Sequence, residues 1–370
     1  MSVVTRLALT DFRCYSTVDL ALPAGVTVVS GANGEGKTSL LEALGWAATT
    51  RSFRGVPDAA LVRTGTEAAY LRVTVQETDR EQLLEAEIRT AGRNRVRLNR
   101  HPLARARDLL GLVRVTVFAP DDLQLVKGGP AERRSYLDEL LVAVAPRYDA
   151  VRGEFDRVLK HRNALLRQGL RGPDAESTLV VFDEQLVRAG SELVRGRLRL
   201  TARLLPALRD AYHALAGPAA DVDAAYETEW AEGSVTPEVD DVEELLRAAL
   251  AARHAAEVER GVTLVGPHRD EWRVRLAGLE ARTHASQGEQ RTLALGLRLA
   301  GHEVVAEVVG TEPVLLLDDV FSELDPARAE ALVAELPSGQ TLITTASAVP
   351  ASVRPERRLR VHDNHVEEAA

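Results

Sequence analysis

The sequence predicts an α/β fold in which one lobe, built on a parallel core sheet with an additional antiparallel sheet, is interrupted by a mainly helical lobe. A glycine-rich loop at residues 31–38 lies between a short apolar run and a helical run. Far downstream, the apolar run 314–317 ends in two acids, Asp318 and Asp319. Between these two features, apolar residues recur at helical spacing from about residue 131 to 216. Strands with helices between them favour a parallel sheet, and the helical stretch favours an insertion.

The individual elements follow from periodicity along the chain. Alternating or short apolar runs predict strands over residues 3–9, 26–29, 70–75, 95–98, 113–118, 314–318 and 341–345. The two runs between residues 70 and 98 indicate the antiparallel sheet. Helical spacing predicts helices over residues 39–44, 242–259, 290–299 and 326–336, besides those of the insertion.

The change of pattern sets the expected domain boundaries. The chain has 370 residues, enough for roughly two domains at about 150 residues each. The helical pattern starts after Pro130 and ends near residue 259. We therefore expect a lobe formed by residues 1–130 and 260–370, with residues 131–259 inserted as the helical lobe.

Composition excludes several classes of protein. Cys14 is the single cysteine, so an internal disulfide is impossible and a reducing compartment is indicated. The longest apolar runs fall well short of the roughly 18 residues of a membrane-spanning helix, and the first residues lack a signal-peptide core. These features predict a cytoplasmic protein without a membrane partner. The net charge of −9 means that any nucleic-acid contact must depend on local basic clusters.

The glycine-rich loop matches the pattern G-x-x-x-x-G-K-[ST] at every fixed position. Its backbone N–H groups are expected to converge on phosphates, with Lys37 neutralising the β- and γ-phosphate charge as a catalytic residue and the Thr38 hydroxyl binding Mg²⁺. The motif predicts an ATP site whose contacts come from Gly31, Ala32, Asn33, Gly34, Glu35, Gly36, Lys37, Thr38 and Ser39.

The two acids that end the apolar run at 314–317 are expected to serve the same nucleotide. Asp318 suits a buried carboxylate that holds Mg²⁺. Asp319 follows where a general base, or a group that orients the attacking water, would stand. The alternative is that Asp319 only fixes the position of Asp318.

A third motif, Ser286-Gln287-Gly288-Glu289, opens the helical run 290–299. A serine and a glycine at a helix N-terminus suit a γ-phosphate, and we expect this phosphate to come from a second copy of the chain. The alternative is an ordinary capping box between Ser286 and Glu289. Ser322 and Asp325 follow the two acids closely, as a loop crossing a dimer interface would.

With these motifs in place, further segments carry a family resemblance. Phe12-Arg13-Cys14-Tyr15 resembles a Phe-Arg-x-Tyr motif, and residues 118–123 with Lys127-Gly128 resemble a Phe-x-Pro-x-Asp-Leu segment. Further similar blocks are Arg133-Arg134-Ser135-Tyr136-Leu137-Asp138, Lys160-His161-Arg162-Asn163-Ala164-Leu165-Leu166 and Gly266-Pro267-His268-Arg269-Asp270. Together they resemble the SMC-like branch of the ABC-type ATPases and, within it, the RecF family of bacterial DNA replication and repair proteins.

The resemblance implies an ABC-type P-loop ATPase lobe interrupted by a helical second lobe. It further implies slow, DNA-stimulated ATP hydrolysis, an ATP-dependent homodimer on gapped or junction DNA, and work with RecO and RecR to load RecA on single strands. Two departures stand out. Gln287-Gly288 occupies a place where ABC-type ATPases have two glycines, and the usual switch histidine is replaced within 343–346, where Thr344 or Thr345 could serve instead.

The expected DNA contacts are arginines near the antiparallel sheet. In a strand, Arg93, Arg95 and Arg97 would project from one face, since side chains alternate with period two. The alternative is a solvated edge whose charges discourage aggregation, in which case the basic helical face with Arg157, Lys160 and Arg162 is the next candidate. His268 could be catalytic or structural, whereas His362 and His365 are expected to be solvated.

Two other classes share the main motifs. The ATPase subunit of a membrane transporter has the phosphate loop, the signature and the magnesium strand, but within a much shorter interval than the roughly 250 residues between Lys37 and Ser286. A chromosome-organising head would carry a long heptad coiled coil, for which the helical insertion is too short.

Overall fold

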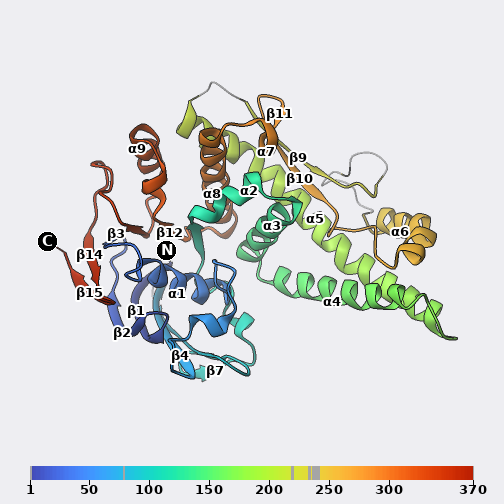
Figure 1. The fold of residues 1–370 in the computed structure, drawn as a ribbon, viewed down its shortest axis with the longest axis horizontal. Coiled ribbons are helices and arrows are strands. Elements are labelled where there is room, and N and C mark those ends of the chain that lie inside the picture. The colour runs from blue at the N-terminus through green and yellow to red at the C-terminus, as the bar shows by residue number, and fades with distance from the viewer. Residues whose placement is uncertain (1, 78–79, 218–220, 232–234, 236–241, 370) are drawn as a thin grey trace. The chain divides into compact units, whose positions relative to one another are not determined.

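A computed structural model describes residues 2–77, 80–217, 221–231, 235 and 242–369, and Figure 1 shows its fold with most helices and strands labelled. The chain forms two compact units. The first unit contains residues 1–122, 211–217 and 295–370, and the second contains residues 123–210 and 218–294.

These boundaries differ from the expected ones at both ends of the insertion. The second unit begins at residue 123 and continues to residue 294, so residues 260–294 fall outside the lobe to which the sequence assigned them. The reason is strand pairing, because β10 (Glu271–Leu276) is antiparallel to β9 (Val222–Glu227) and to β11 (Leu279–Glu280). The turn signals at Pro130 and near residue 259 do not reveal that pairing.

The core sheet of the first unit has six strands in the order β15-β14-β3-β13-β12-β8. Its parallel strands are β3 (Val26–Ser30), β8 (Val115–Phe118), β12 (Val314–Asp318), β13 (Thr341–Thr345) and β14 (Arg357–His362). The register places Asp318 opposite Thr344 and Thr345 opposite Ser30. The glycine-rich loop and the two acids therefore leave the sheet at the same edge.

The antiparallel β15 (His365–Glu368) completes this sheet beside β14. This C-terminal hairpin was not predicted from the sequence, because residues 357–368 are dominated by charged side chains and histidines. Its turn uses Asp363 and Asn364, both at positive φ (48° and 60°), which short polar side chains tolerate better than most.

The second sheet of the first unit is antiparallel, as the alternation between residues 70 and 98 predicted. Its strands run in the order β2-β1-β4-β5-β6-β7. They comprise β1 (Ser2–Phe12), β2 (Tyr15–Ala21), β4 (Ala68–Glu77), β5 (Arg80–Arg89), β6 (Arg95–Leu98) and β7 (His101–Pro102).

Apolar clusters cover both faces of the core sheet. Helix α1 (Lys37–Thr49), with the fully buried Trp46, packs in one cluster together with the antiparallel sheet and with Leu316 of β12. Leu315 and Leu317 project from the other face into a cluster with α9 (Pro326–Ala334). Alternate side chains of one strand thus enter different cores, which explains the uninterrupted apolar run before Asp318.

The second unit is mainly helical. Its helices are α2 (Gln124–Lys127), α3 (Pro130–Val144), α4 (Arg147–Arg167), α6 (Val242–Arg260), α7 (Ala281–His284) and parts of α5 (Ala175–Ala216) and α8 (Gln287–Val309). Among the described residues, no helix has the length and apolar character needed to cross a membrane.

Candidate functional site

The glycine-rich loop joins β3 to α1 in the order that the motif requires. Gly34 and Gly36 have positive φ values of 87° and 104°, which side chains rarely adopt. A Cβ atom at Gly36 would lie 2.5 Å from the Cys14 sulfur and 2.9 Å from the Tyr15 hydroxyl oxygen. The Tyr15 hydroxyl also donates to the Gly36 carbonyl at 3.1 Å. Position 36 therefore admits only glycine, and Tyr15 of β2 contacts the loop at this position.

Lys37 begins α1 and is buried, with its Nζ donating to the Ala32 carbonyl at 2.8 Å. The ammonium thus folds back over the loop, where a phosphate would be a stronger acceptor than a carbonyl. The first amides of α1 point toward the same loop and carry the positive end of the helix dipole. The arrangement suits a polyphosphate.

The half-buried Arg13 forms an ion pair with Glu42 of α1, and this pair was not predicted from the sequence. Arg13, at positive φ (55°), donates to both carboxylate oxygens of Glu42 at 2.7 Å, and the Ser52 hydroxyl donates to the same carboxylate at 2.5 Å. Glu42 is fully buried on α1. An acid on the apolar face of a predicted helix is the signal that could have revealed this pair.

Asp318 lies at the end of β12 and accepts two hydroxyl hydrogen bonds on one carboxylate oxygen. The donors are Thr38 at 2.8 Å and Thr344 at 2.7 Å. Burial raises the pKa of Asp318, and the two hydroxyl donors oppose that shift. Thr38 and Asp318, which the sequence assigned to one metal, are therefore in direct contact. Hydroxyl and carboxylate oxygens are ligands that Mg²⁺ prefers, so this pair fits the ion.

Asp319 is half-buried and adopts a left-handed backbone conformation, with φ of 48°. Its N–H donates to the Thr344 carbonyl at 3.0 Å, and its carboxylate accepts the N–H of Ala346 at 3.3 Å. A positive φ in an aspartate at the end of a sheet is a sparsely populated conformation that often accompanies function. The turn directs Asp319 away from the path that β12 would have continued.

The two threonines named as substitutes for the switch histidine differ in their contacts. Thr344 contacts both acids, because its hydroxyl lies 2.7 Å from Asp318 and accepts the Asp319 N–H at 3.2 Å. The Thr345 hydroxyl instead donates to the Ser347 carbonyl at 2.9 Å and accepts the Ser347 N–H at 3.0 Å. Thr344 thus belongs to the carboxylate cluster, and Thr345 holds the following turn.

The Ser286 motif lies in the second unit and forms a capping box at the start of α8. The Glu289 N–H donates to the Ser286 hydroxyl at 3.3 Å, and the Glu289 carboxylate accepts the Ser286 N–H at 2.7 Å. Ser286 and Gln287 are nevertheless exposed, whereas Gly288 is half-buried. The helix begins at Gln287, earlier than its apolar spacing alone predicted.

Ser322 and Asp325 both make local contacts after β12. The Ser322 hydroxyl donates to the Asp319 carbonyl at 2.8 Å. Asp325 caps α9 by accepting the Arg328 N–H at 3.0 Å, which is the main reason why its pKa is lowered. Both side chains are exposed.

The arginine cluster of the antiparallel sheet is only partly as expected. Arg95 and Arg97 lie on β6 and are exposed on one face, with Val96 buried between them. The strand begins at Arg95, as predicted, and Arg93 precedes it, so the prediction that Arg93 projects from the strand face was wrong. Arg95 lies 3.5 Å from Glu87 on β5 and remains 69% exposed.

The alternative DNA-binding face, with Arg157, Lys160 and Arg162, cannot offer all three side chains to DNA. Arg162 is fully buried and pairs with Asp183 and with the equally buried Glu257, both at 2.6 Å. A guanidinium held by two carboxylates inside the second unit cannot meet a DNA phosphate. The burial of Arg162 could not be predicted from periodicity, because the pattern does not distinguish an arginine at a core position from one at the surface.

The three histidines considered in the sequence differ in how far they are buried. His268 is half-buried and packs against Phe155, and this desolvation lowers its pKa to about 4. The ring nitrogen Nε2 lies 3.3 Å from the Thr263 carbonyl, so the contacts of His268 are those of a structural residue. The neighbouring Asp270 accepts hydrogen bonds from Tyr226 and Trp230 at 2.5 and 2.6 Å. His362 and His365 are exposed, as predicted.

Comparisons with known proteins agree on one family. The model of the RecF/RecN/SMC N-terminal domain matches residues 3–357. A DNA replication and repair protein RecF from Frankia alni is 47% identical over 362 residues, and one from Streptomyces avermitilis is 46% identical over 351 residues. The matches cover 95% and 93% of this chain, and the same shares of those relatives.

Solved structures place the fold in the same group. A structure described as the recombination mediator protein RecF with ATP in the RecFOR pathway has a TM-score of 0.92 at 29% identity, over 100% of this chain and 98% of that one. An Smc head domain from Pyrococcus furiosus matches with a TM-score of 0.59 at 15% identity, covering 100% and 96% of the two chains. That second likeness shows the fold alone, which is the ABC/SMC-type ATPase fold.

Proposed function

Because the chain belongs to the RecF family of DNA replication and repair proteins, we propose that it binds and hydrolyses ATP and that ATP drives its dimerisation on DNA. The observation that carries the proposal is the contact of Thr38 and Thr344 with Asp318, next to a glycine-rich loop that already holds Lys37. Three segments distant in sequence meet at one sheet edge: the loop supplies a phosphate cradle, a cation and one metal ligand, residues 318–319 supply two carboxylates, and Thr344 supplies a hydroxyl.

In this mechanism the loop amides and Lys37 bind the β- and γ-phosphates, and Lys37 exchanges the Ala32 carbonyl for phosphate oxygens. Thr38 and Asp318 would hold Mg²⁺, which when bound neutralises charge on the phosphate oxygens. Asp319 orients the attacking water or accepts its proton. Thr344 holds both acids in position, because it hydrogen-bonds to the side chain of Asp318 and to the backbone N–H of Asp319.

The site is completed by the Ser286 motif of a second copy. In the capping box Ser286 uses its oxygen as an acceptor, so its hydroxyl proton can still be donated to a γ-phosphate oxygen. The exposed Ser286 and Gln287 lie at the positive end of the α8 dipole. Ser322 and Asp325, exposed just after β12, would meet the partner copy near the same nucleotide.

The target is gapped or junction DNA, and the partners are RecO and RecR, with which the protein helps to load RecA on single strands. Support for this part comes from the names of the relatives and from the RecFOR pathway given for the solved RecF structure. Arg95 and Arg97, exposed on β6, together with Arg93 just before it, are the proposed phosphate contacts.

The proposal is tested by ATP turnover with and without DNA. We expect slow hydrolysis that requires Mg²⁺ and rises when gapped duplex DNA is added, with less stimulation by blunt duplex. Lys37→Ala should lose ATP binding, measured with a fluorescent ATP analogue, because its ammonium cannot be replaced by the loop amides. Equal turnover with and without every form of DNA would contradict the proposed stimulation of ATP hydrolysis by DNA.

A further inference from the structure

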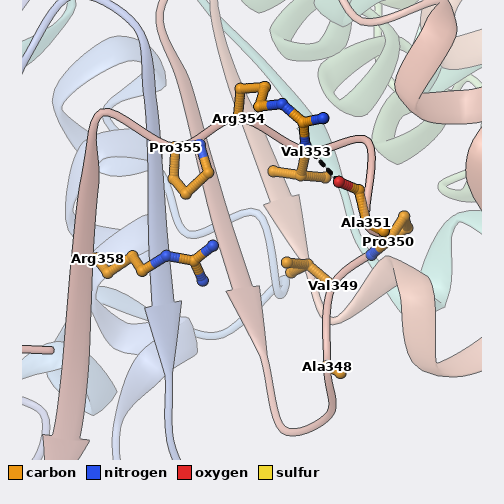
Figure 2. A pocket seen from close by; sticks show the side chains of 8 residues that line it. All are labelled: Ala348, Val349, Pro350, Ala351, Val353, Arg354, Pro355 and Arg358. Atoms are coloured by element: carbon orange, nitrogen blue, oxygen red, sulfur yellow. Dashed lines mark hydrogen bonds between the residues drawn. The ribbon is translucent and has the colours of Figure 1, made fainter. Parts of the chain in front are cut away.

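A pocket of about 430 Å³ lies in the first unit on the segment that connects β13 to β14 (Figure 2). Its apolar walls include Val349, Pro350, Val353 and Pro355, and its two charged side chains are Arg354 and Arg358. In Figure 2 the Arg358 guanidinium extends into the pocket from β14. The ATP mechanism uses none of these residues.

The walls of the pocket are held in place by the fold. Val353 is buried in the cluster on the α9 face of the core sheet, and its N–H donates to the Pro350 carbonyl at 3.1 Å. The Ser352 hydroxyl donates to Glu330 on α9, and the Arg354 guanidinium donates to the Ala351 carbonyl. Two prolines further restrict the backbone. The pocket is therefore formed before any ligand arrives.

The charge in the pocket is unbalanced. On β14, Leu359 and Val361 are buried on one face, so Arg358 and Arg360 project from the other and are exposed. The neighbouring Arg357 pairs with Glu368 at 2.8 Å. Within the described part of the chain, by contrast, no carboxylate forms an ion pair with Arg354 or Arg358. Two guanidinium groups therefore lie beside apolar walls, in a chain whose net charge is −9. A ligand that complements both features is an anion with an apolar part.

We propose that this pocket binds an acidic peptide segment of a partner protein, with a carboxylate on Arg354 and Arg358 and an apolar side chain against Val349 and Val353. Guanidinium groups bind planar carboxylates through paired hydrogen bonds, and the volume suits a few side chains. A nucleic-acid backbone would satisfy the arginines but leave the apolar walls without contacts. The segment starts beside the ATP site, where the Ala346 N–H donates to Asp319, so the partner would touch the chain that holds this carboxylate.

The test is selection from a random twelve-residue peptide library on the full-length protein, independent of ATP hydrolysis. We expect enrichment of sequences with Asp or Glu next to Leu, Ile or Phe. One enriched peptide, labelled for fluorescence anisotropy, should bind Arg358→Ala about tenfold or more weakly, because hydrogen bonds between charged groups contribute most to such contacts. Arg354→Ala should act in the same direction.

Arg360→Ala is the matched control, since it removes an exposed arginine from the same face of β14 outside the pocket, and it should leave the affinity unchanged. A version of the peptide with Asn and Gln in place of its acids should not bind. The proposal is overturned by enriched peptides whose binding ignores Arg354 and Arg358. It is equally overturned if these two variants weaken binding of a DNA oligonucleotide and leave the peptide affinity unchanged.

Discussion

At the scale of single residues, the two neighbouring acids after β12 have different environments. Asp318 is buried and receives two hydroxyl hydrogen bonds, whereas Asp319 is half-buried, in a left-handed conformation, and receives one backbone N–H. Burial raises the pKa of Asp318, and a divalent cation would favour its ionised form. These differences support the proposal that Asp318 holds the metal and that Asp319 acts on water.

We therefore expect Asp319→Asn to lower the rate of ATP hydrolysis by about 10²–10⁴-fold, the usual effect of losing a general base, while ATP and Mg²⁺ still bind. Asp318→Asn should instead weaken the Mg²⁺ dependence of nucleotide binding, because an amide is a poorer ligand for the ion. Single-turnover hydrolysis and Mg²⁺ titrations separate the two effects. Near-normal turnover in Asp319→Asn would show that it only fixes Asp318.

At the scale of elements, the core sheet and the phosphate loop were predictable and the C-terminal hairpin was not. The apolar run before Asp318 identifies a strand buried on both faces, and the glycine pattern identifies the loop between β3 and α1. In the hairpin of β14 and β15, few apolar residues alternate and arginines and acids occupy most of the other positions. The period-two pattern that predicts a strand is therefore weak. The register that brings Thr344 to Asp318 depends on parallel pairing between segments far apart in sequence, which no local pattern encodes.

For the strand β6, we predict a role in binding DNA phosphates. Arg95→Ala combined with Arg97→Ala should weaken binding to duplex DNA, because each arginine is expected to neutralise one phosphate. The slope of log affinity against log salt should become shallower by about 0.9 for each phosphate that the variant no longer neutralises, or roughly 2 in total. Relative affinities for different sequences should not change, because phosphate contacts carry no sequence information.

The measurement is DNA affinity over a range of salt concentrations with a non-hydrolysable ATP analogue. Arg72→Ala, an exposed arginine on β4 that pairs with Glu85, serves as the control on the same sheet. An unaltered slope in the double variant would mean that β6 is only a solvated edge. Because Arg162 is buried, the helical face of α4 could not then supply the full set of contacts that the sequence suggested.

At the level of the whole molecule, the proposed ATP site needs two copies of the chain. The phosphate loop and the two acids belong to the first unit, whereas the Ser286 motif belongs to the second. The sequence predicted all three motifs, but their division between two compact units follows from the antiparallel pairing of β9 with β10, which periodicity does not reveal. The capping box shows that Ser286 has a local role in α8, and its exposure leaves it accessible to a nucleotide held by another copy.

We propose that ATP is shared between the phosphate loop of one copy and Ser286 of another, and light scattering with and without ATP distinguishes this arrangement from a site formed by one chain. We expect the unmodified protein to become a dimer when ATP and Mg²⁺ are added. Ser286→Arg should still bind a fluorescent ATP analogue but remain a monomer, because a bulky charged side chain would stand where the γ-phosphate must fit. Ala251→Arg, which adds the same charge at an exposed position on α6, should dimerise normally. An unchanged ATP-dependent dimer in Ser286→Arg would contradict the shared site.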